Sequence, residues 1–482
     1  MKKIPLRFDV LLILVVFLLS RIIVAAFDIR LDYGALYRNW QYLDVTTLHE
    51  DLLKGVWYDH TQPPVFNLLL GLVLKLAGAH ARLVFTGILK MITLANTLLL
   101  LAILKRTVQH PWLPLLFSLL YLLSPASIIF ENELFYTSFI TLLLLTSCYY
   151  LTALKRSINW RKATGFFLPL VIVCLTRSMY HLLWLSTLCT LVLIWYRKRH
   201  GAGLLLAFSL ASILVAGSWY VKNYIVFREF STSTWMGMNI ARNVFHDANL
   251  TDSSKIEFIE PFSRISAYRR FLPAGYKDKY AGIADRVLLQ EWKNDSFINE
   301  KEVGYIQVSH LYMQACKQEI KAHPAAYAKN VMQSAIIFFA PATRYPTTEY
   351  QAAKIAWYDL LYSFNLSHFA KGKAQRRVAL TLSAIPKALV YMLVLYWLIR
   401  ETARRRAAGK AWREMVPGGM LTLFITCIIG YIFVISSLFE HYENMRFRYE
   451  AEPLFLILAA HVLYNWQLKS NFKKNDRVTP AQ

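Results

Sequence analysis

Long apolar runs constrain the fold of this chain more than any other feature of its sequence. Such runs, each of about 15 to 25 residues, recur along most of the 482 positions, and 56% of the residues are hydrophobic. A helix needs roughly 20 apolar residues to cross the hydrocarbon core of a bilayer. The sequence therefore predicts an all-α polytopic membrane protein.

Runs that can serve as membrane spans occur at about ten places. They cover residues 9–27, 83–104, 111–129, 136–154, 163–176, 181–196, 203–220, 380–399, 415–436 and 453–467. The first run follows a basic stretch but is longer than the apolar part of a typical cleaved signal, so we expect it to remain as an anchoring helix. We predict a bundle of about ten transmembrane helices.

Two further apolar stretches are predicted to lie along the membrane surface. Residues 65–78 would extend only about 21 Å as a helix, and they include Asn67 and Lys75. Pro64, just before them, suits the first turn of a helix. If residues 326–345 crossed the membrane, the later basic stretch "ARRR" at residues 403–406 would lie outside. We therefore expect both stretches to form juxtamembrane helices.

The basic residues predict which side of the membrane each connection faces. With those two stretches left out of the bundle, most Lys and Arg of the short connections fall on one side, and short cytoplasmic connections are the ones that collect such residues. These clusters are the N-terminal tail, "KRTVQH", "LKRSINWRK", "YRKRH", "RETARRRAAGKAWR" and "LKSNFKKNDR". We expect both termini in the cytoplasm. The net charge of +24 then reflects topology, so no nucleic-acid partner is predicted.

This topology divides the chain into three parts. Residues 1–220 form a transmembrane core whose first outer loop is 28–82, residues 221–379 form a long extracytoplasmic segment, and residues 380–482 carry the last spans with an outer loop at 437–453. Of the five cysteines, only Cys316 lies in a polar stretch, so the sequence offers no disulfide framework and no metal-binding cysteine pair.

Carboxylates from distant parts of the chain are predicted to gather on the outer face. Asp28 and Asp32 follow the first span, and Glu131 and Glu133 lie in "FENELFYT". Most acids in loops are simply solvated. Glu131 and Glu133 differ because they lie near the lipid boundary, where a charge needs a partner or a function.

Cations and mixed aromatic and polar clusters also fall toward the outer face. The spans contain Arg21, Lys90 and Lys387, which either snorkel to head groups or form a ring at the level of a lipid phosphate. Aromatic residues are common at membrane interfaces, whereas the polar residues among them suit a sugar or a phosphate. The candidate substrate-binding residues are Asp28, His60, Glu131, Arg177, Tyr180, His181, Lys222, Asn223, Asn239, Arg446, Arg448 and Tyr449.

Four motifs and their order resemble the GT-C superfamily of membrane glycosyltransferases. They are "RLDYGALYRNW" after the first span, "HTQPPVFNLLLGL" in the first outer loop, "ENELFYT" after the third span and the late "ENMRFRYEAEPL". The resemblance covers about residues 1–240 and 420–460, and it is closest to bacterial members that use polyprenyl-phosphate sugars. It implies sugar transfer to a glycan, lipid or protein acceptor at the outer face of the bacterial cytoplasmic (inner) membrane.

The resemblance also implies roles for the outer residues. Asp32 matches the acid just past the first helix, which makes it the expected catalytic base, with Asp28 as the alternative. Glu133 is expected to position the acceptor or to hold a divalent cation with Asp32. The donor phosphate would be bound by Arg446 and Arg448, with Lys222 and Arg177 as further candidates. Members of the superfamily differ in metal dependence, so the cofactor stays open.

Two other functions compete with this interpretation. A transporter or lipid flippase could also use about ten spans with intramembrane cations. It would be expected to show inverted repeats and charges near the bilayer midplane, and the sequence shows neither. A polysaccharide polymerase or ligase would also use lipid-linked glycans, but it would favour Arg and His in the long outer segment over an acid in the first loop.

Overall fold

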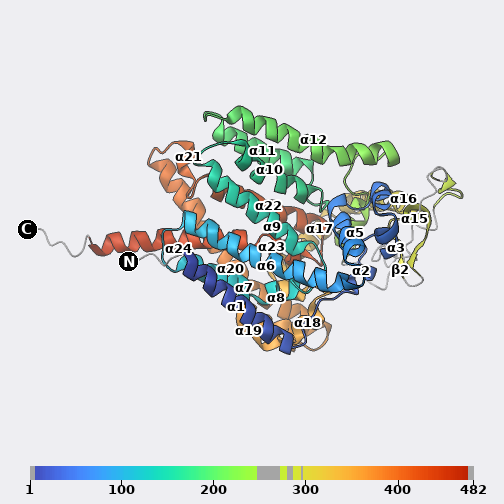
Figure 1. Cartoon of the computed structure of the whole chain (residues 1–482), viewed down its shortest axis with the longest axis horizontal. Helices are drawn as coiled ribbons and strands as arrows, with labels where there is room; N and C mark the ends of the chain where they lie inside the picture. The colour runs from blue at the N-terminus through green and yellow to red at the C-terminus, as the bar shows by residue number, and fades with distance from the viewer. Residues whose placement is uncertain (1–5, 247–271, 279, 281–285, 295–296, 476–482) are drawn as a thin grey trace, which may run out of the picture.

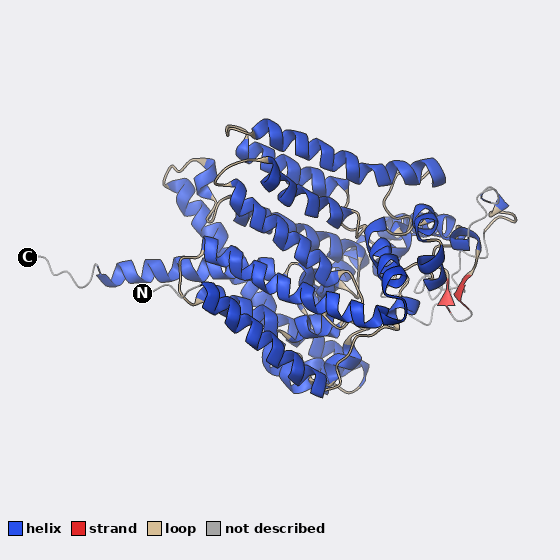
Figure 2. Ribbon diagram, viewed as in Figure 1, coloured by secondary structure: helices blue, strands red, loops and turns tan. Residues whose placement is uncertain are grey.

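A computed structural model of the chain describes residues 6–246, 272–278, 280, 286–294 and 297–475. Helices dominate this part of the chain (Figure 2), and its strands β1 (Trp292–Asn294) and β2 (Phe297–Ile298) form one short antiparallel pair. The predicted all-α class is therefore confirmed.

The long helices run side by side along the long axis of the molecule (Figure 1). They are α1 (Leu6–Ala26), α6 (Ala81–Thr107), α9 (Thr137–Leu154), α10 (Trp160–Cys174), α11 (Leu182–Tyr196), α12 (Ala202–Phe227), α20 (Gly372–Ala407), α22 (Met420–Phe439) and α24 (Glu452–Asn475). Many of their large apolar side chains are exposed, as a lipid environment requires. These helices identify a membrane-embedded protein.

Six stretches of the described residues are both long and apolar enough to cross a bilayer. They are Phe8–Ala26, Pro64–Thr107, Thr137–Leu154, Ala202–Phe227, Ala374–Ala407 and Met420–Phe439, while Leu113–Leu123 and Leu182–Tyr196 are apolar but shorter. The figure of about ten spans is therefore not confirmed by helix length and composition, and it stays a prediction.

One expected span is wrong in its extent. The run at 111–129 forms two helices, α7 (Leu113–Leu123) and α8 (Pro125–Phe130), which are separated at Ser124. A residue before proline is driven out of the helical region, and Ser124 accordingly has a ψ of 136°. Its side-chain oxygen then accepts a hydrogen bond from the amide of Ser127 and caps α8.

The apolar stretch at 65–78 forms its own helix, α5 (Pro64–Ala77). It ends at Gly78, whose φ of 49° is unfavourable for other residues, and the short η1 (Gly78–His80) leads into α6. Gly71 lets α5 pack closely on α3 (Val45–Glu50) and α4 (Leu52–Tyr58), since a Cβ atom there would collide with Leu52. That α5 lies along the membrane stays a prediction.

The two ends of the helix bundle carry different elements (Figure 1). The start of α1, the end of α24 and the short α21 (Trp412–Met415) lie at one end. The opposite end carries α2 (Ala35–Arg38), α3, α5, α15 (Arg286–Leu289) and β2. We call this second end the loop end. Its assignment to the outside of the cell stays a prediction.

The described residues of the range 221–379 pack against one another and against the helix bundle. The boundary expected at residue 220 lies inside α12, which continues to Phe227. Beyond it, α13 (Met236–Val244) packs on α16 (Gly304–Ala322), and α17 (Pro324–Phe339) packs against α20, α22 and α23 (Asn444–Glu450). Besides α15, β1 and β2, the segment also contains η4 (Ala342–Arg344), α18 (Glu349–Ala353), α19 (Ala356–Ser363) and η5 (Leu366–Phe369). This segment therefore helps to build the loop end.

Candidate functional site

The structure brings together the two acids that were expected to be catalytic. Asp32 and Glu133 pair through a parallel β-bridge, in which the amide of Asp32 donates to the carbonyl of Asn132 at 2.9 Å. Asp32 follows α1, and Glu133 lies in the turn between α8 and α9. Two loops far apart in the sequence thus place their carboxylates side by side.

Asp32 is the more accessible acid of the pair. Its side chain is 23% exposed, and Nη2 of Arg38 donates to its Oδ2 at 2.5 Å. Gly34 makes this contact possible, because a Cβ atom there would lie 2.5 Å from Nη1 of Arg38. The ion pair holds the carboxylate in one orientation at the protein surface.

Glu133 is buried and only partly satisfied. Its Oε1 accepts a hydrogen bond of 3.0 Å from Thr347, while its Oε2 has no hydrogen-bond partner among the described residues. Burial raises the pKa of Glu133 to about 7, and the neighbouring charge of Asp32 adds to this effect. Near neutral pH, Glu133 can therefore hold or release a proton beside Asp32.

The other two predicted acids lie outside this pair. Glu131 is fully buried and accepts three hydrogen bonds of 2.6 to 3.1 Å from Arg21. Asp28 is 64% exposed and forms ion pairs with Arg30 at 2.7 Å and Lys354 at 3.3 Å. Glu131 therefore forms a buried ion pair inside the protein, whereas Asp28 forms ion pairs at the surface.

The three cations in the spans do not form a ring of free charges. Arg21 is bound by Glu131, and Lys387 donates to Glu452 at 2.6 Å. The charge of Lys90 acts on Glu131 and favours its ionised form. Arg21 and Lys387 are thus engaged with carboxylates of the protein itself.

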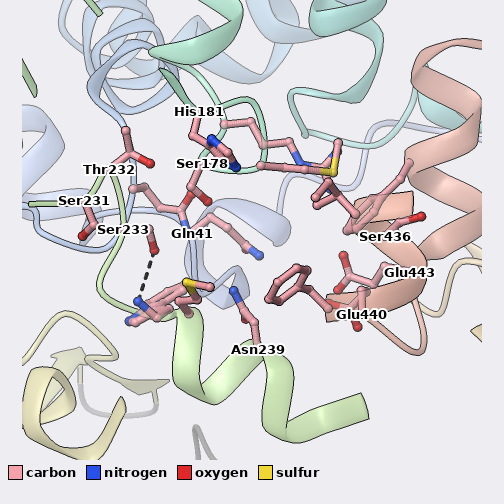
Figure 3. A pocket seen from close by; sticks show the side chains of 18 of the residues that line it. Gln41, Ser178, His181, Ser231, Thr232, Ser233, Asn239, Ser436, Glu440 and Glu443 are labelled. Carbon is pink, nitrogen blue, oxygen red and sulfur yellow. Dashed lines mark hydrogen bonds between the residues drawn. The ribbon is translucent and has the colours of Figure 1, made fainter. Parts of the chain in front are cut away.

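A cavity of about 360 Å³ lies where several connections meet, namely those between α2 and α3, α10 and α11, α12 and α13, and α22 and α23. Figure 3 shows the side chains that point into it. It is lined by Trp40, Gln41, Gln62, Tyr136, Arg177, Ser178, Met179, His181, Tyr220, Phe230, Ser231, Thr232, Ser233, Trp235, Met236, Asn239, Arg242, Ile435, Ser436, Phe439, Glu440, Glu443, Arg446 and Phe447. Its lining mixes aromatic rings, neutral hydrogen-bonding groups and charges, as ligand sites do.

Asp32 and Glu133 do not line this cavity, although the two sites are neighbours. Tyr136, three residues after Glu133, is part of the cavity lining. Arg446 lines the cavity as well, and its charge acts on Glu133. The acid pair therefore lies close to the part of the lining that carries Tyr136 and Arg446.

Three charged residues share one wall of the cavity. Glu440 lies just after α22 and Glu443 just before α23, and both point into the cavity in Figure 3. Nη1 of Arg242, from α13, lies 3.4 Å from Glu440 and 3.9 Å from Glu443. We call Glu440, Glu443 and Arg242 the carboxylate wall.

The pKa values of the two acids of the carboxylate wall are shifted in opposite directions. Burial raises the pKa of Glu440, and the charge of Glu443 adds to this, while Arg242 opposes it. Burial also opposes ionisation of Glu443, but Arg446 and then Arg242 lower its pKa below the usual value. Glu443 is therefore the acid that stays ionised more readily.

Arg446 and Arg448 were both predicted to bind the donor phosphate, but only Arg446 lines the cavity. Arg446 is 1% exposed and binds Glu443, while its Nε and Nη1 have no hydrogen-bond partner among the described residues. Arg448 donates to the carbonyls of Phe338 at 2.8 Å and Ala340 at 3.2 Å and binds Glu452. Arg448 therefore ties α23 to α17, whereas Arg446 keeps free donors.

Arg177, Tyr180 and His181 lie in the turn between α10 and α11. Arg177 lines the cavity, binds Glu450 and stacks over the ring of Phe447 at 3.7 Å. Tyr180 donates to the same glutamate at 2.7 Å and is buried behind the cavity, while His181 lines it. Glu450 thus orients two of the three predicted residues.

Lys222 and His60 hold the loops around the cavity and do not line it. Nζ of Lys222 donates to the carbonyl of Asp59 at 2.7 Å. The ring of His60 contacts Oγ1 of Thr234 at 2.7 Å and the carbonyl of Lys301 at 2.9 Å, and burial lowers the pKa of His60 to about 4. Both side chains are engaged with the protein itself.

Asp59 and Lys301 form the centre of this supporting network, with a separation of 3.1 Å. Burial opposes the charge of Asp59, but Lys301 and hydrogen bonds from Thr61 hold the pKa of that carboxyl below its usual value. Lys301 also donates to the carbonyl of Gln41 at 3.2 Å. Lys301 thereby ties the chain around residue 301 to the loop residues Gln41 and Asp59 next to the cavity.

The last three candidates have different surroundings. Asn239 lines the cavity. Asn223 donates to the carbonyl of Ser231 at 2.7 Å and so supports the cavity from behind. Tyr449 donates to Ser127 at 3.0 Å inside the core. Of these three, only Asn239 can contact a molecule in the cavity.

Sequence reasoning missed the carboxylate wall and the run Ser231–Ser233. One signal could have shown part of it, because Glu440, Glu443 and Arg446 follow one another at intervals of three residues. Such spacing places side chains on one side of a helical turn. Arg242 carried no comparable signal, since it reaches the wall from a separate helix.

The described residues contain no group of three or more His, Cys, Asp or Glu side chains arranged to hold a metal ion. Asp32 and Glu133 offer oxygen ligands side by side, which a hard divalent cation prefers. Such an ion would need further oxygen ligands from substrate or water. The cofactor therefore stays open.

Comparisons with known proteins gave no match to a family model, to a curated protein or to a solved structure.

Proposed function

We propose that this protein is a glycosyltransferase of the GT-C type, which moves a sugar from a polyprenyl-phosphate-linked donor to an acceptor at the extracytoplasmic face. One observation carries the proposal. Two carboxylates from separate loops meet beside a cavity whose lining mixes aromatic rings, neutral hydrogen-bonding groups and a buried arginine with unpaired donors. Sugars are bound by the first two kinds of group, and phosphates by arginine.

The proposed reaction is a single displacement that inverts the anomeric carbon. The acceptor oxygen forms a bond to that carbon, and the bond from the carbon to the phosphate oxygen breaks. The phosphate leaves with the electron pair, and the proton of the acceptor hydroxyl goes to Asp32. A base is needed because a hydroxyl is a weak nucleophile, whereas a phosphate leaves readily if cations hold its charge.

The surroundings of the two acids support this division of roles. Asp32 is accessible and held by Arg38, so an acceptor can reach it from the surface. Glu133 has a pKa of about 7 and is therefore able to carry the proton onward or to hydrogen-bond the acceptor. A carboxyl that exchanges its proton near neutral pH is suited to acid–base work beside a second carboxyl.

The phosphate of the donor would be bound by Arg446, with Arg177 at the same wall. Arg446 has two unpaired donor nitrogens and lies 4.4 Å from the ring of Phe135, so its charge is fixed in place. Fixed cations stabilise developing negative charge without reorganisation. The polyprenyl chain would stay in the bilayer beside the exposed apolar helices, and the acceptor would be a glycan, a lipid or a protein.

The variant Asp32→Asn tests this proposal. Wild type and variant, purified in lipid nanodiscs, are compared for sugar transfer, and cell-envelope glycans are compared by mass spectrometry with and without the protein. We expect normal insertion and a loss of transfer of about 10² to 10⁴-fold, as for removal of a general base. Asp28→Asn is the matched control, because Asp28 is an exposed acid of the same loop.

Retained turnover in Asp32→Asn, or an equal loss in Asp28→Asn, would contradict the role of Asp32. A transporter or flippase would instead move a labelled polyprenyl phosphate lipid across a vesicle membrane and leave envelope glycans without a missing sugar. That outcome would overturn the proposed function itself.

A further inference from the structure

Two walls of the cavity face each other across its interior (Figure 3). Glu440 and Glu443 of the carboxylate wall lie on one side, and the hydroxyl side chains of Ser231, Thr232 and Ser233 lie on the other. Asn239 and Gln41 point into the space between them. A molecule in this space is therefore surrounded by hydrogen-bonding groups on opposite sides.

The arrangement of charges favours a neutral ligand at the carboxylate wall. Glu440 and Glu443 share Arg242, and Glu443 also binds Arg446. Each carboxylate thus has a cation beside it, while acceptor positions on both remain available to a ligand. Adjacent hydroxyl groups of a sugar can donate to such carboxylates and accept from a guanidinium. A second negative charge here would be repelled by two acids.

The carboxylate wall is positioned by backbone contacts. Oε1 of Glu440 accepts hydrogen bonds from the amides of His441 at 3.0 Å and Tyr442 at 3.3 Å. Its Oε2 accepts a longer hydrogen bond of 3.4 Å from Nη1 of Arg242. The side chain is therefore held through one oxygen, and the other is the weaker-bound one.

Arg446 provides a second and independent sign that the cavity takes a ligand. It lines the cavity, is 1% exposed, and has two donor nitrogens without a hydrogen-bond partner in the described part of the chain. Buried donors are normally satisfied, and leaving them unpaired is unfavourable. An anionic group bound at Arg446 would satisfy them.

We propose that the carboxylate wall recognises the hydroxyl groups of an uncharged sugar ring, while Arg446 binds the phosphate attached to it. This inference rests on the proposed function and names the class of donor: a polyprenyl phosphate carrying a neutral sugar rather than a uronic acid. The cavity volume of about 360 Å³ is within the range of small-ligand sites. The aromatic rings of Trp40, Tyr136 and Phe447 in the lining offer apolar faces to the ring.

Binding without an acceptor tests the inference. The protein in nanodiscs is titrated with three lipids: decaprenyl phosphate glucose, decaprenyl phosphate glucuronic acid and decaprenyl phosphate without a sugar. We expect wild type to bind the glucose lipid about 10-fold more tightly than either other lipid, since a site with placed polar groups discriminates strongly. Glu440→Gln should weaken binding of the glucose lipid about 10-fold and leave binding of the sugar-free lipid unchanged.

Two further variants complete the test. Asn239→Ala should produce the same pattern with a loss of about 3-fold, which keeps the inference testable if Glu440→Gln does not fold. Glu414→Gln is the control, because Glu414 is an exposed glutamate of α21 at the other end of the bundle. It should change none of the three affinities.

Different failures have different meanings. If wild type binds the glucose lipid but neither Glu440→Gln nor Asn239→Ala weakens that binding, the role of the wall is overturned and the proposed function stands. Equal losses for the sugar-free lipid would also overturn it. If wild type binds none of the three lipids, the proposed function fails as well.

Discussion

Buried charged side chains are fully paired in one region of this protein and only partly paired in another. Between the helices, Arg21 satisfies Glu131 with hydrogen bonds of 2.6 to 3.1 Å. At the loop end, Glu133 has one oxygen without a partner, and Arg446 has two such nitrogens, within the described residues. Glu131 and Glu133 are only two positions apart, so their roles are decided by what lies opposite each of them.

The comparison separates charges that stabilise the structure from charges that are available to a ligand. In a closed pair, two buried charges satisfy each other. Removing one partner strongly destabilises the protein, because the other charge is left buried without compensation. We call a buried charged group open if it lacks part of its hydrogen-bond partners. Such a group already destabilises the native state, and proteins retain such groups mainly at functional sites. Variants of matched residues in the two regions should therefore change different quantities.

The largest effect is expected in the closed region. Arg21→Met should lower the free energy of unfolding by about 3 to 5 kcal/mol, because Glu131 would be left buried and unpaired. Adding Glu131→Leu should restore most of this stability. Thermal unfolding of the single and double variants in detergent measures the difference. A single variant as stable as wild type would show that the pair is not closed in the way described.

Glu133 should behave in the opposite way. Its pKa of about 7 lies above the ordinary value of 4.5, so the native state holds the proton more tightly than the unfolded state does. Stability is therefore lost as pH rises from about 4.5 through 7. Glu133→Gln should remove that loss and raise the free energy of unfolding by about 3 kcal/mol at pH 8, with little change below pH 4.

Unfolding measured across this pH range checks the prediction for Glu133. A difference between wild type and variant that did not depend on pH would contradict it. We also expect Glu133→Gln to impair sugar transfer even where it stabilises the protein. Lower activity together with higher stability would show that Glu133 is retained for function and not for folding.

Arg446 and Arg448 provide a matched pair of arginines on one short helix. Arg446→Gln should weaken binding of polyprenyl phosphate about 10-fold, as the loss of a hydrogen bond to a charged group does. Arg448→Gln should instead lower the melting temperature, because two carbonyls would lose the guanidinium donor and Glu452 would keep only Lys387. Lipid titration and thermal unfolding of both variants separate the two effects. If Arg446→Gln lowered the melting temperature and Arg448→Gln weakened lipid binding, the two assigned roles would be contradicted.

The smallest effect is expected at the surface. Asp28 and Arg30 are 64% and 74% exposed, so water already solvates both charges. Arg30→Gln should change the free energy of unfolding by no more than about 0.2 to 1 kcal/mol. The change should decrease further as salt is added. A larger or salt-independent change, measured by thermal unfolding, would mean that Asp28 belongs to the closed region.

Parts of the site could be predicted from the sequence, and others could not. The proximity of Asp32 and Glu133 was expected from the sidedness of the loops that carry them. Their separation from Asp28 and Glu131 was not expected, because the partners Lys354 and Arg21 lie far from these acids in the sequence. The carboxylate wall was missed because Arg242 reaches it from α13.

The helices show the same division. Each expected span contains a helix, but the run at 111–129 is broken at Ser124, where a proline signal was present and was not used. Arg446 and Arg448 looked equivalent in the sequence. Residues two apart on a helix point in different directions, and only packing decides which of them faces a cavity.

The sequence alone determined that this chain is helical and embedded in a membrane, because the length and apolarity of a run are local properties. Only the tertiary structure decided which charges are paired and which remain open. Those pairings join residues far apart in the chain, such as Arg21 with Glu131 and Arg242 with Glu440. The energy of a charge depends on the groups packed around it, and these are settled only when the helices have come together.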